Sequence, residues 1–187
     1  RFSPSGMLYN NKGPILGSKG DKKNFLYLGF LNSIVTNYFL KIQGTIGFEA
    51  GYISTVPYSN QIEEKKSRIR SLVEQNISLS KLDWDAFETS WDFVKHPLLP
   101  VASTSSATEL FNSINISDCY SKWEGECSDR FARLKSNEEE LNRIFIEIYG
   151  LQDELTPEVE DKDVTVRKAD LQRDIKSLIS YAVGCMF

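Results

Sequence analysis

Residues 128–149 read SDRFARLKSNEEELNRIFIEIY and are followed by Gly150. Apolar residues recur in this stretch three, four or seven positions apart, the spacing that lines one face of an α-helix. The members of this stripe are Phe131, Leu134, Leu141, Phe145 and Ile148. Because glycine commonly ends a helix, the sequence predicts one long helix over 128–149 that ends at Gly150.

The same spacing recurs on both sides of this helix. After an acidic loop, a last helix is predicted from its apolar residues, which are Leu171, Ile175, Leu178, Ile179 and Ala182. Nearer the N-terminus, apolar residues over 28–42 predict a helix closed by Gly44. Ser59 or Asn60 is expected to cap a further, charged helix.

Two segments have the pattern of extended chain. Residues 1–20 contain six glycines and prolines with short apolar runs between them, which indicates strands and turns. Residues 45–58 carry β-branched and aromatic residues before and around Pro57, which favours short extended segments. The predicted fold class is therefore α+β and helix-rich, with a small strand-containing N-terminal lobe followed by a mainly helical part.

The predicted domain organisation divides the chain near residue 100. Residues 83–100 are aromatic and end in proline, so they are expected to form an ordered connector packed on the core. Residues 103–106 read STSS, the one low-complexity stretch. We therefore expect a lobe over 1–100 and a helical, acidic region over 101–187, or one continuous domain.

Composition excludes several classes of protein. The chain has 187 residues, of which 41% are hydrophobic, enough to bury a core. No apolar run approaches the roughly 18 residues of a membrane span, and no signal peptide opens the chain. Three cysteines cannot all pair, so a reducing cytoplasm is the expected compartment. The first residue is arginine and the last residues are apolar, which suggests a piece of a larger protein.

Enzyme motifs are scarce. The only histidine, His96, lies beside Pro97 and is expected to be structural or exposed rather than a catalytic base. No Gly-x-Ser-x-Gly elbow and no phosphate-binding glycine loop are present. Acid pairs such as Asp83 and Asp85 are expected to form a solvated face. The cysteines at 119, 127 and 185 lack zinc-ligand spacing and are expected to be buried free thiols.

A basic N-terminal segment is the feature that suggests a ligand. Residues 1–58 carry six Lys and Arg against two acids, whereas residues 101–187 carry ten against seventeen. Lysine amines suit DNA phosphates and side-chain amides suit base edges. The predicted phosphate contacts are Lys12, Lys19, Lys22, Lys23 and Lys41, and the predicted base contacts are Asn32 and Gln43. Alternatively the lysines only keep a loop soluble, and Asn32 and Lys41 cap or shield their helix.

Short runs of residues carry a family resemblance. The earlier runs are LGFLNS (28–33), YFLK (38–41), GYI (51–53) and VPY (56–58). They resemble the target-recognition region of N6-adenine DNA methyltransferases, which follows the catalytic domain. The later and more specific runs are DWDAFETSWDF (83–93), HPLL (96–99), LNRIF (141–145), YGLQDEL (149–155) and ISYAVGCMF (179–187). These runs resemble the adenine-specific methyltransferase of bacterial BREX phage-defence systems, and residues 101–122 match least.

This resemblance implies a parent enzyme that transfers a methyl group from S-adenosylmethionine to the N6 atom of adenine in duplex DNA. Such enzymes extrude the target base from the stack. The family's catalytic Asn-Pro-Pro-Tyr loop is absent here, because none of the six prolines are adjacent, and its glycine-rich cofactor motif is absent too. The resemblance therefore implies a fragment that is inactive alone and holds no cofactor or metal of its own.

The function that we expect is target recognition within such a methyltransferase. The expected partners are double-stranded DNA, the methyltransferase domain of the parent and other defence-system proteins, with no membrane. A face near residues 9–23 and 41–47 would meet DNA, and the acidic helices would pack against protein. The alternative is a protein-interaction scaffold that docks defence subunits, or a phage inhibitor, through its acidic helices. A third possibility is a self-contained enzyme around His96 and nearby acids.

Overall fold

The computed structural model describes residues 23–43, 50–99 and 115–186. Within these residues the protein is helical and contains no β-strand. Its helices are α1 (Asn24–Leu31), α2 (Ile34–Ile42), α3 (Ala50–Ser54), α4 (Gln61–Glu64), α5 (Lys66–Asp85), α7 (Ile116–Tyr149) and α8 (Leu171–Gly184). The predicted α+β class with a strand-containing lobe is therefore wrong. Residues 1–20 lie outside the described part, and Ala50–Ser54, within the predicted extended segment, is helical.

The chain divides into two compact units. Unit 1 comprises residues up to Ile77 together with Lys135–Asp161, and unit 2 comprises Ser78–Leu134 together with Lys162–Phe187. Both α5 and α7 therefore contribute residues to each unit. The predicted division near residue 100 stays a prediction, because residues 100–114 lie outside the described part.

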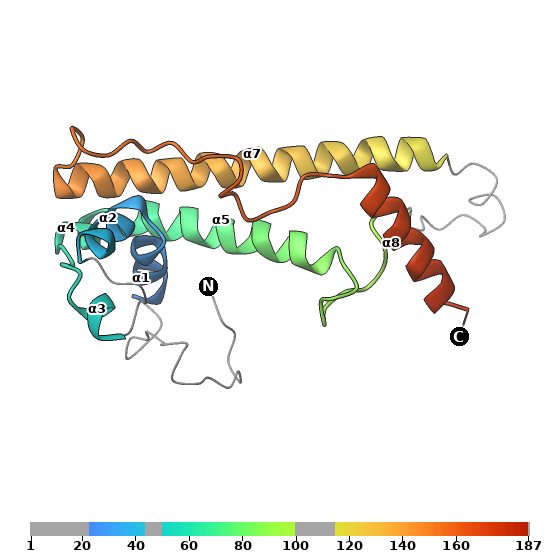
Figure 1. The fold of residues 1–187 in the computed structure, drawn as a ribbon, viewed down its shortest axis with the longest axis horizontal. Coiled ribbons are helices and arrows are strands. Elements are labelled where there is room, and N and C mark those ends of the chain that lie inside the picture. The colour runs from blue at the N-terminus through green and yellow to red at the C-terminus, as the bar shows by residue number, and fades with distance from the viewer. Residues whose placement is uncertain (1–22, 44–49, 100–114, 187) are drawn as a thin grey trace. The chain divides into compact units, whose positions relative to one another are not determined.

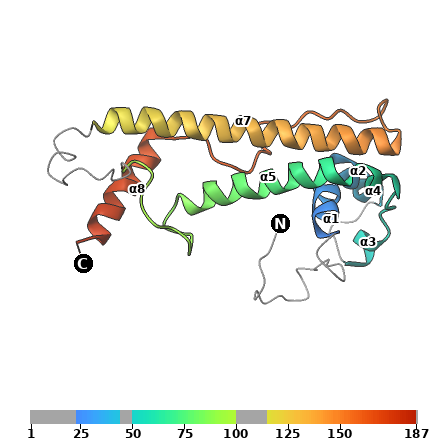
Figure 2. The same cartoon turned by 180° about the vertical axis from the view of Figure 1, so that it is seen from behind.

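Unit 1 is built around the first half of α5 and the last turns of α7. Helices α1, α2 and α4 gather at this end of α5, and Figures 1 and 2 show the group from opposite sides. Its hydrophobic core consists of Leu26, Phe30, Val35, Leu40, Val56, Ile62, Ile69, Leu72, Val73, Leu141, Ile144, Phe145 and Ile146. Burial of apolar side chains from five helices and the segment after α3 is the main source of stability here.

Helix α1 approaches α5 closely at Gly29. A Cβ atom on Gly29 would lie 2.9 Å from the Val73 side chain and 3.3 Å from that of Ile69. Such distances are shorter than ordinary van der Waals contact, so a side chain at this position would fit only if Val73 and Ile69 shifted. The glycine thus brings Phe30, the next residue of α1, to its 2% exposed position in the core.

The predicted helix over 28–42 is two helices that meet at Asn32 and Ser33. The Ser33 hydroxyl accepts a hydrogen bond from the Thr36 backbone N–H and donates one to the Phe30 carbonyl at 2.7 Å. A serine in this position caps the new helix. The Asn142 side chain reinforces the start of α2, because its oxygen accepts a 3.0 Å hydrogen bond from Ile34 N–H.

The predicted end of the long helix at Gly150 is confirmed. Helix α7 ends at Tyr149, and Gly150 has a φ of 65°, the left-handed conformation that glycine adopts at helix ends. Leu151 N–H then donates to the Ile146 carbonyl at 3.0 Å. The helix begins at Ile116, earlier than predicted. After Gly150 the chain turns back along α7, as Figure 1 shows.

Unit 2 has a smaller core. It is formed by Leu98, Trp123 and Cys127, with partly buried residues of α8 and of the aromatic connector packed around them. Of the connector predicted over 83–100, residues 83–85 belong to α5 and residue 100 lies outside the described part, while residues 86–99 form turns and bury His96 and Leu98, as expected of an ordered segment. The predicted last helix is confirmed as α8, whose N-cap, Asp170, accepts a hydrogen bond from Arg173 N–H.

Candidate nucleic-acid interface

Four of the seven residues predicted to contact DNA lie in the described part of the chain, all in unit 1. Lys12, Lys19 and Lys22 lie outside it. Lys23, Asn32, Lys41 and Gln43 are exposed, and each stands at the end of a helix. Their role in binding DNA stays a prediction, and what the structure shows is the set of contacts that each side chain already makes.

Lys23 immediately precedes α1 and is held by an ion pair. Its Nζ atom lies 2.9 Å from Oε1 of Glu63, a residue of α4. The hydrogen bond and charge of Glu63 raise the pKa of the Lys23 ammonium above its usual value. Lys23 is therefore positively charged at neutral pH, but a phosphate would have to compete with Glu63 for its amine.

Asn32 follows α1 and satisfies the end of that helix. Its side-chain amide donates a 2.7 Å hydrogen bond to the Leu28 carbonyl. This is the capping role that the sequence left open as an alternative to a base contact. Reading a base edge with the same N–H group would require this bond to break, while the amide oxygen stays available as an acceptor.

Lys41 and Gln43 lie at the C-terminal end of α2. Lys41 is the basic residue in the last turn of α2, and its amine has no ion-pair partner among the described residues. Its charge is favourable beside the carboxyl end of the helix dipole. Gln43 donates from Nε2 to Thr55 Oγ1 at 2.8 Å, which ties the end of α2 to the segment after α3.

Carboxylates compete for many of the cations in unit 1. Ion pairs join Lys65 to Glu147, Arg70 to Glu74, Lys135 to Asp161, and both Arg68 and Arg143 to Glu140. The segment 151–161 carries five acids and no Lys or Arg. Carboxylates at these positions would repel phosphates.

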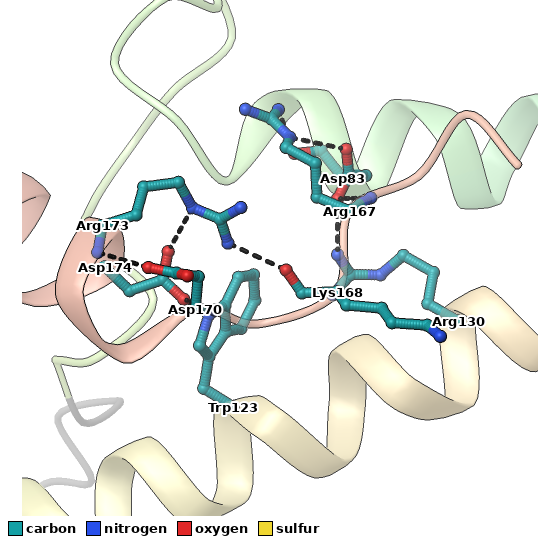
Figure 3. A network of polar contacts seen from close by, with 8 residues as sticks. All are labelled: Asp83, Trp123, Arg130, Arg167, Lys168, Asp170, Arg173 and Asp174. Atoms are coloured by element: carbon teal, nitrogen blue, oxygen red, sulfur yellow. Dashed lines mark hydrogen bonds and ion pairs between the residues drawn. The ribbon is translucent and has the colours of Figure 1, made fainter. Parts of the chain in front are cut away.

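Unit 2 contains a buried charge network that the sequence did not reveal. Asp83, predicted to lie on a solvated face, is only 5% exposed. Its carboxylate accepts hydrogen bonds from Arg130 and from both the backbone and the side chain of Arg167, at 3.2–3.4 Å. Figure 3 shows these donors converging on Asp83 from segments far apart in the sequence.

A second buried carboxylate, Asp174, lies at the start of α8. It accepts hydrogen bonds from the Trp123 indole at 3.0 Å and from the Arg173 side chain at 2.7 Å (Figure 3). It also accepts a 3.0 Å hydrogen bond from the backbone N–H of Asp170. Removing one partner of a buried ion pair leaves an uncompensated charge. The donors of both carboxylates are already engaged with them, so the network serves to hold unit 2 together.

His96 and the cysteines occupy different environments. His96 is 2% exposed, and its Nδ1 accepts a hydrogen bond from Leu98 N–H at 3.3 Å. Burial lowers the pKa of His96, so its ring is neutral at pH 7.

Cys127 is buried, which raises the pKa of its thiol to about 11. The prediction of three buried thiols is wrong, since Cys119 is partly buried and Cys185 is exposed.

Two kinds of feature are absent from the described residues. No group of three or more His, Cys, Asp or Glu side chains stands close enough to hold a metal ion, within the described ranges. Among the same residues, no helix has the length and apolar character needed to cross a membrane.

Comparison with known proteins relates the chain to a larger enzyme. No protein-family model matches it. The adenine-specific methyltransferase PglX of Lacticaseibacillus casei (strain Zhang) is 43% identical over 189 residues, covering 100% of this chain and 15% of PglX. The chain is homologous to one segment of that methyltransferase. The adenine-specific methyltransferase BrxX of Escherichia coli O9:H4 (strain HS) is 26% identical over 203 residues, covering 99% of this chain and 16% of BrxX.

These matches confirm the resemblance to adenine-specific methyltransferases that the sequence motifs indicated. The chain spans less than one sixth of the length of PglX, so most of that protein has no counterpart here. The structure also shows what some residues of the motif runs do. In the first run, Phe30 lies in the core and Ser33 caps α2, while Tyr149 from a later run stacks on Phe30 with ring centroids 5.6 Å apart.

Proposed function

We propose that this chain is a DNA-contacting segment of an adenine-specific methyltransferase of phage defence, in which it helps to position duplex DNA. The match of the whole chain to 15% of PglX carries the proposal. The exposed cations at the ends of α1 and α2 support it, because Lys41 has no carboxylate partner among the described residues. Phosphate contacts of this kind fix the position of a protein on the duplex.

Methyl transfer would take place outside this segment. The sequence contains neither an Asn-Pro-Pro-Tyr loop nor a glycine-rich cofactor motif. S-adenosylmethionine, which supplies the methyl group in enzymes of this kind, would therefore be bound by other parts of the polypeptide. Under this proposal the present chain contributes binding and orientation of DNA, and the residues that do so are not catalytic.

The experiment that tests this function compares matched lysine variants in a DNA-binding titration. Fluorescence anisotropy of a labelled mixed-sequence duplex is measured against the wild-type chain, Lys41→Ala and Lys66→Ala. Lys66 is a suitable control because it is an exposed lysine of unit 1 outside the predicted contact set. Each lost phosphate contact should lower the salt slope by about 0.9. We expect that reduction for Lys41→Ala only, and equal slopes in all three proteins would contradict the proposal.

A scaffold that docks other proteins is the second candidate function. Two observations favour it, the run of carboxylates over 151–161 and the apolar side chains exposed on unit 2. Trp91 is fully exposed and Val94 is 86% exposed on the connector of that unit. Exposed aromatic residues often anchor protein partners. Absence of duplex binding at low salt would favour this scaffold over the DNA-contacting segment.

A further inference from the structure

An aromatic cavity lies in unit 1 beside the predicted DNA contacts. Its volume is about 190 Å³, and its walls come from α1 and from the segment between Ile53 and Tyr58. Three rings, those of Tyr27, Phe30 and Tyr58, line it together with the aliphatic side chains of Leu31, Ile53 and Val56. An apolar cavity of about 150 Å³ is enough to hold a benzene molecule. The space is therefore large enough for one planar ring system.

The three rings are held in fixed positions by their neighbours. Tyr58 packs edge-on against Tyr27 and Phe30, with centroid distances of 5.3 and 5.7 Å. Phe30 in turn is stacked on Tyr149, whose hydroxyl bonds to the backbone of Pro57. Because these contacts already order the rings, little free energy is lost in ordering the site when a ligand stacks there.

Tyr58 also has an unmet hydrogen-bonding requirement. Its hydroxyl is buried and has no hydrogen-bond partner among the described residues. Burial, together with the charge of Glu63, raises the pKa of this phenol to about 12, so it remains a protonated donor at neutral pH. A buried donor without a partner is costly. Because the hydroxyl is buried, a ligand in the cavity can contact the ring of Tyr58 but not this oxygen.

Residues predicted to contact DNA are close in sequence to residues that line the cavity, or are hydrogen-bonded to a neighbour of such residues. Lys23 lies one helical turn before Tyr27, and Asn32 directly follows Leu31 in the sequence. Gln43 is hydrogen-bonded to Thr55, which stands between the lining residues Ser54 and Val56. A DNA strand held by these side chains would therefore pass the cavity. A phosphate group would find no cation among the residues that line it.

We propose that this cavity receives one unstacked nucleobase of the bound DNA, held against the partly exposed rings of Tyr27 and Tyr58. The inference rests on the proposed function, because it requires the chain to contact DNA. Bases present a flat apolar face and a polar edge, and every base can stack on an aromatic side chain. Enzymes that modify a base in a duplex disturb the stack, which leaves bases without their usual neighbours.

The test uses a duplex in which 2-aminopurine lies opposite an abasic site, together with a fully paired duplex of the same sequence. Anisotropy reports overall binding, and 2-aminopurine fluorescence reports whether the base is stacked. The wild-type chain should bind the duplex with the unpaired base at least about fivefold more tightly, from base–aromatic stacking. The 2-aminopurine fluorescence should fall on binding as the base stacks on the rings.

Variants separate the cavity from the rest of the surface. Ile53→Phe adds a ring to a cavity wall and should abolish both the preference and the fluorescence change, while paired DNA still binds. Ile42→Phe is the matched control, because Ile42 is 65% exposed and does not line the cavity. Tyr58→Phe keeps the ring, so it should retain both the fluorescence change and the preference. Thermal unfolding of each variant establishes that it is folded.

The outcomes distinguish this proposal from the function on which it rests. If DNA binds and Ile53→Phe behaves like Ile42→Phe, the nucleobase site is refuted and the DNA-contacting function stands. If neither duplex binds at low salt, the proposed function fails and the nucleobase site fails with it. Equal affinity for the two duplexes, without a fluorescence change, also refutes the site.

Discussion

Replacing Asp83 by Asn removes the negative charge that faces Arg130 and Arg167 in the network of Figure 3. The side chains of Asp83 and Arg130 are only 8% and 10% exposed, whereas that of Arg167 is 35% exposed. Breaking a buried pair by removing one partner costs about 3–5 kcal/mol. Water can solvate Arg167 but hardly Arg130, so we expect the lower end, about 3 kcal/mol, in the free energy of unfolding.

The assay is a urea unfolding titration monitored by circular dichroism, and the control variant is Asp92→Asn. Asp92 also faces a cation of unit 2, Lys81, but its side chain is 69% exposed. Exposed pairs contribute about 0–1 kcal/mol. We therefore expect a large loss of stability in Asp83→Asn and a small one in Asp92→Asn. Equal losses in the two variants would refute the claim that burial gives the Asp83 network its importance.

Three further predictions concern packing and titration. Gly29→Ala should lower the free energy of unfolding by about 1–3 kcal/mol in urea titrations, because the new Cβ would lie 2.9 Å from Val73. The pKa of His96 is lowered in the folded state, so its contribution is complete above the unfolded pKa near 6.5 and is lost as the pH falls below it. Urea midpoints measured from pH 8 to pH 5 should therefore fall more steeply in the wild type than in His96→Gln. Iodoacetamide at pH 8 should modify exposed Cys185 in the native protein and Cys127 only after unfolding, as mass spectrometry of timed samples can establish.

Regular helical features could be predicted because their signals are local. The apolar stripe that ends at Gly150 gave the end of α7, and the spacing around Ile175 gave α8. The break between α1 and α2 was missed because apolar spacing continues across it, although Ser33 is a good capping residue. Ala50–Ser54 was misassigned because aromatic and β-branched residues favour strands only weakly, and tertiary packing overrides that preference.

The polar contacts of the candidate sites lie beyond local patterns. Asp83 is bonded by residues 47 and 84 positions away, so its sequence neighbourhood resembles an ordinary charged surface. Similarly, the ion pair of Lys23 with Glu63 joins residues forty positions apart, and only the folded chain shows it. Residue types could show the excess of Lys and Arg over acids in the first 58 residues, whereas the competition from carboxylates could not be read from the sequence.

Under the proposed function, this chain contacts DNA through phosphate-binding cations. The most direct measurement is the affinity of the wild-type chain for a mixed-sequence duplex, determined by anisotropy at several salt concentrations. With three or four phosphate contacts, the logarithm of the binding constant should fall against the logarithm of the salt concentration with a slope of roughly −3 to −4. Absence of binding at low salt, or an affinity that does not change with salt, would contradict the claim.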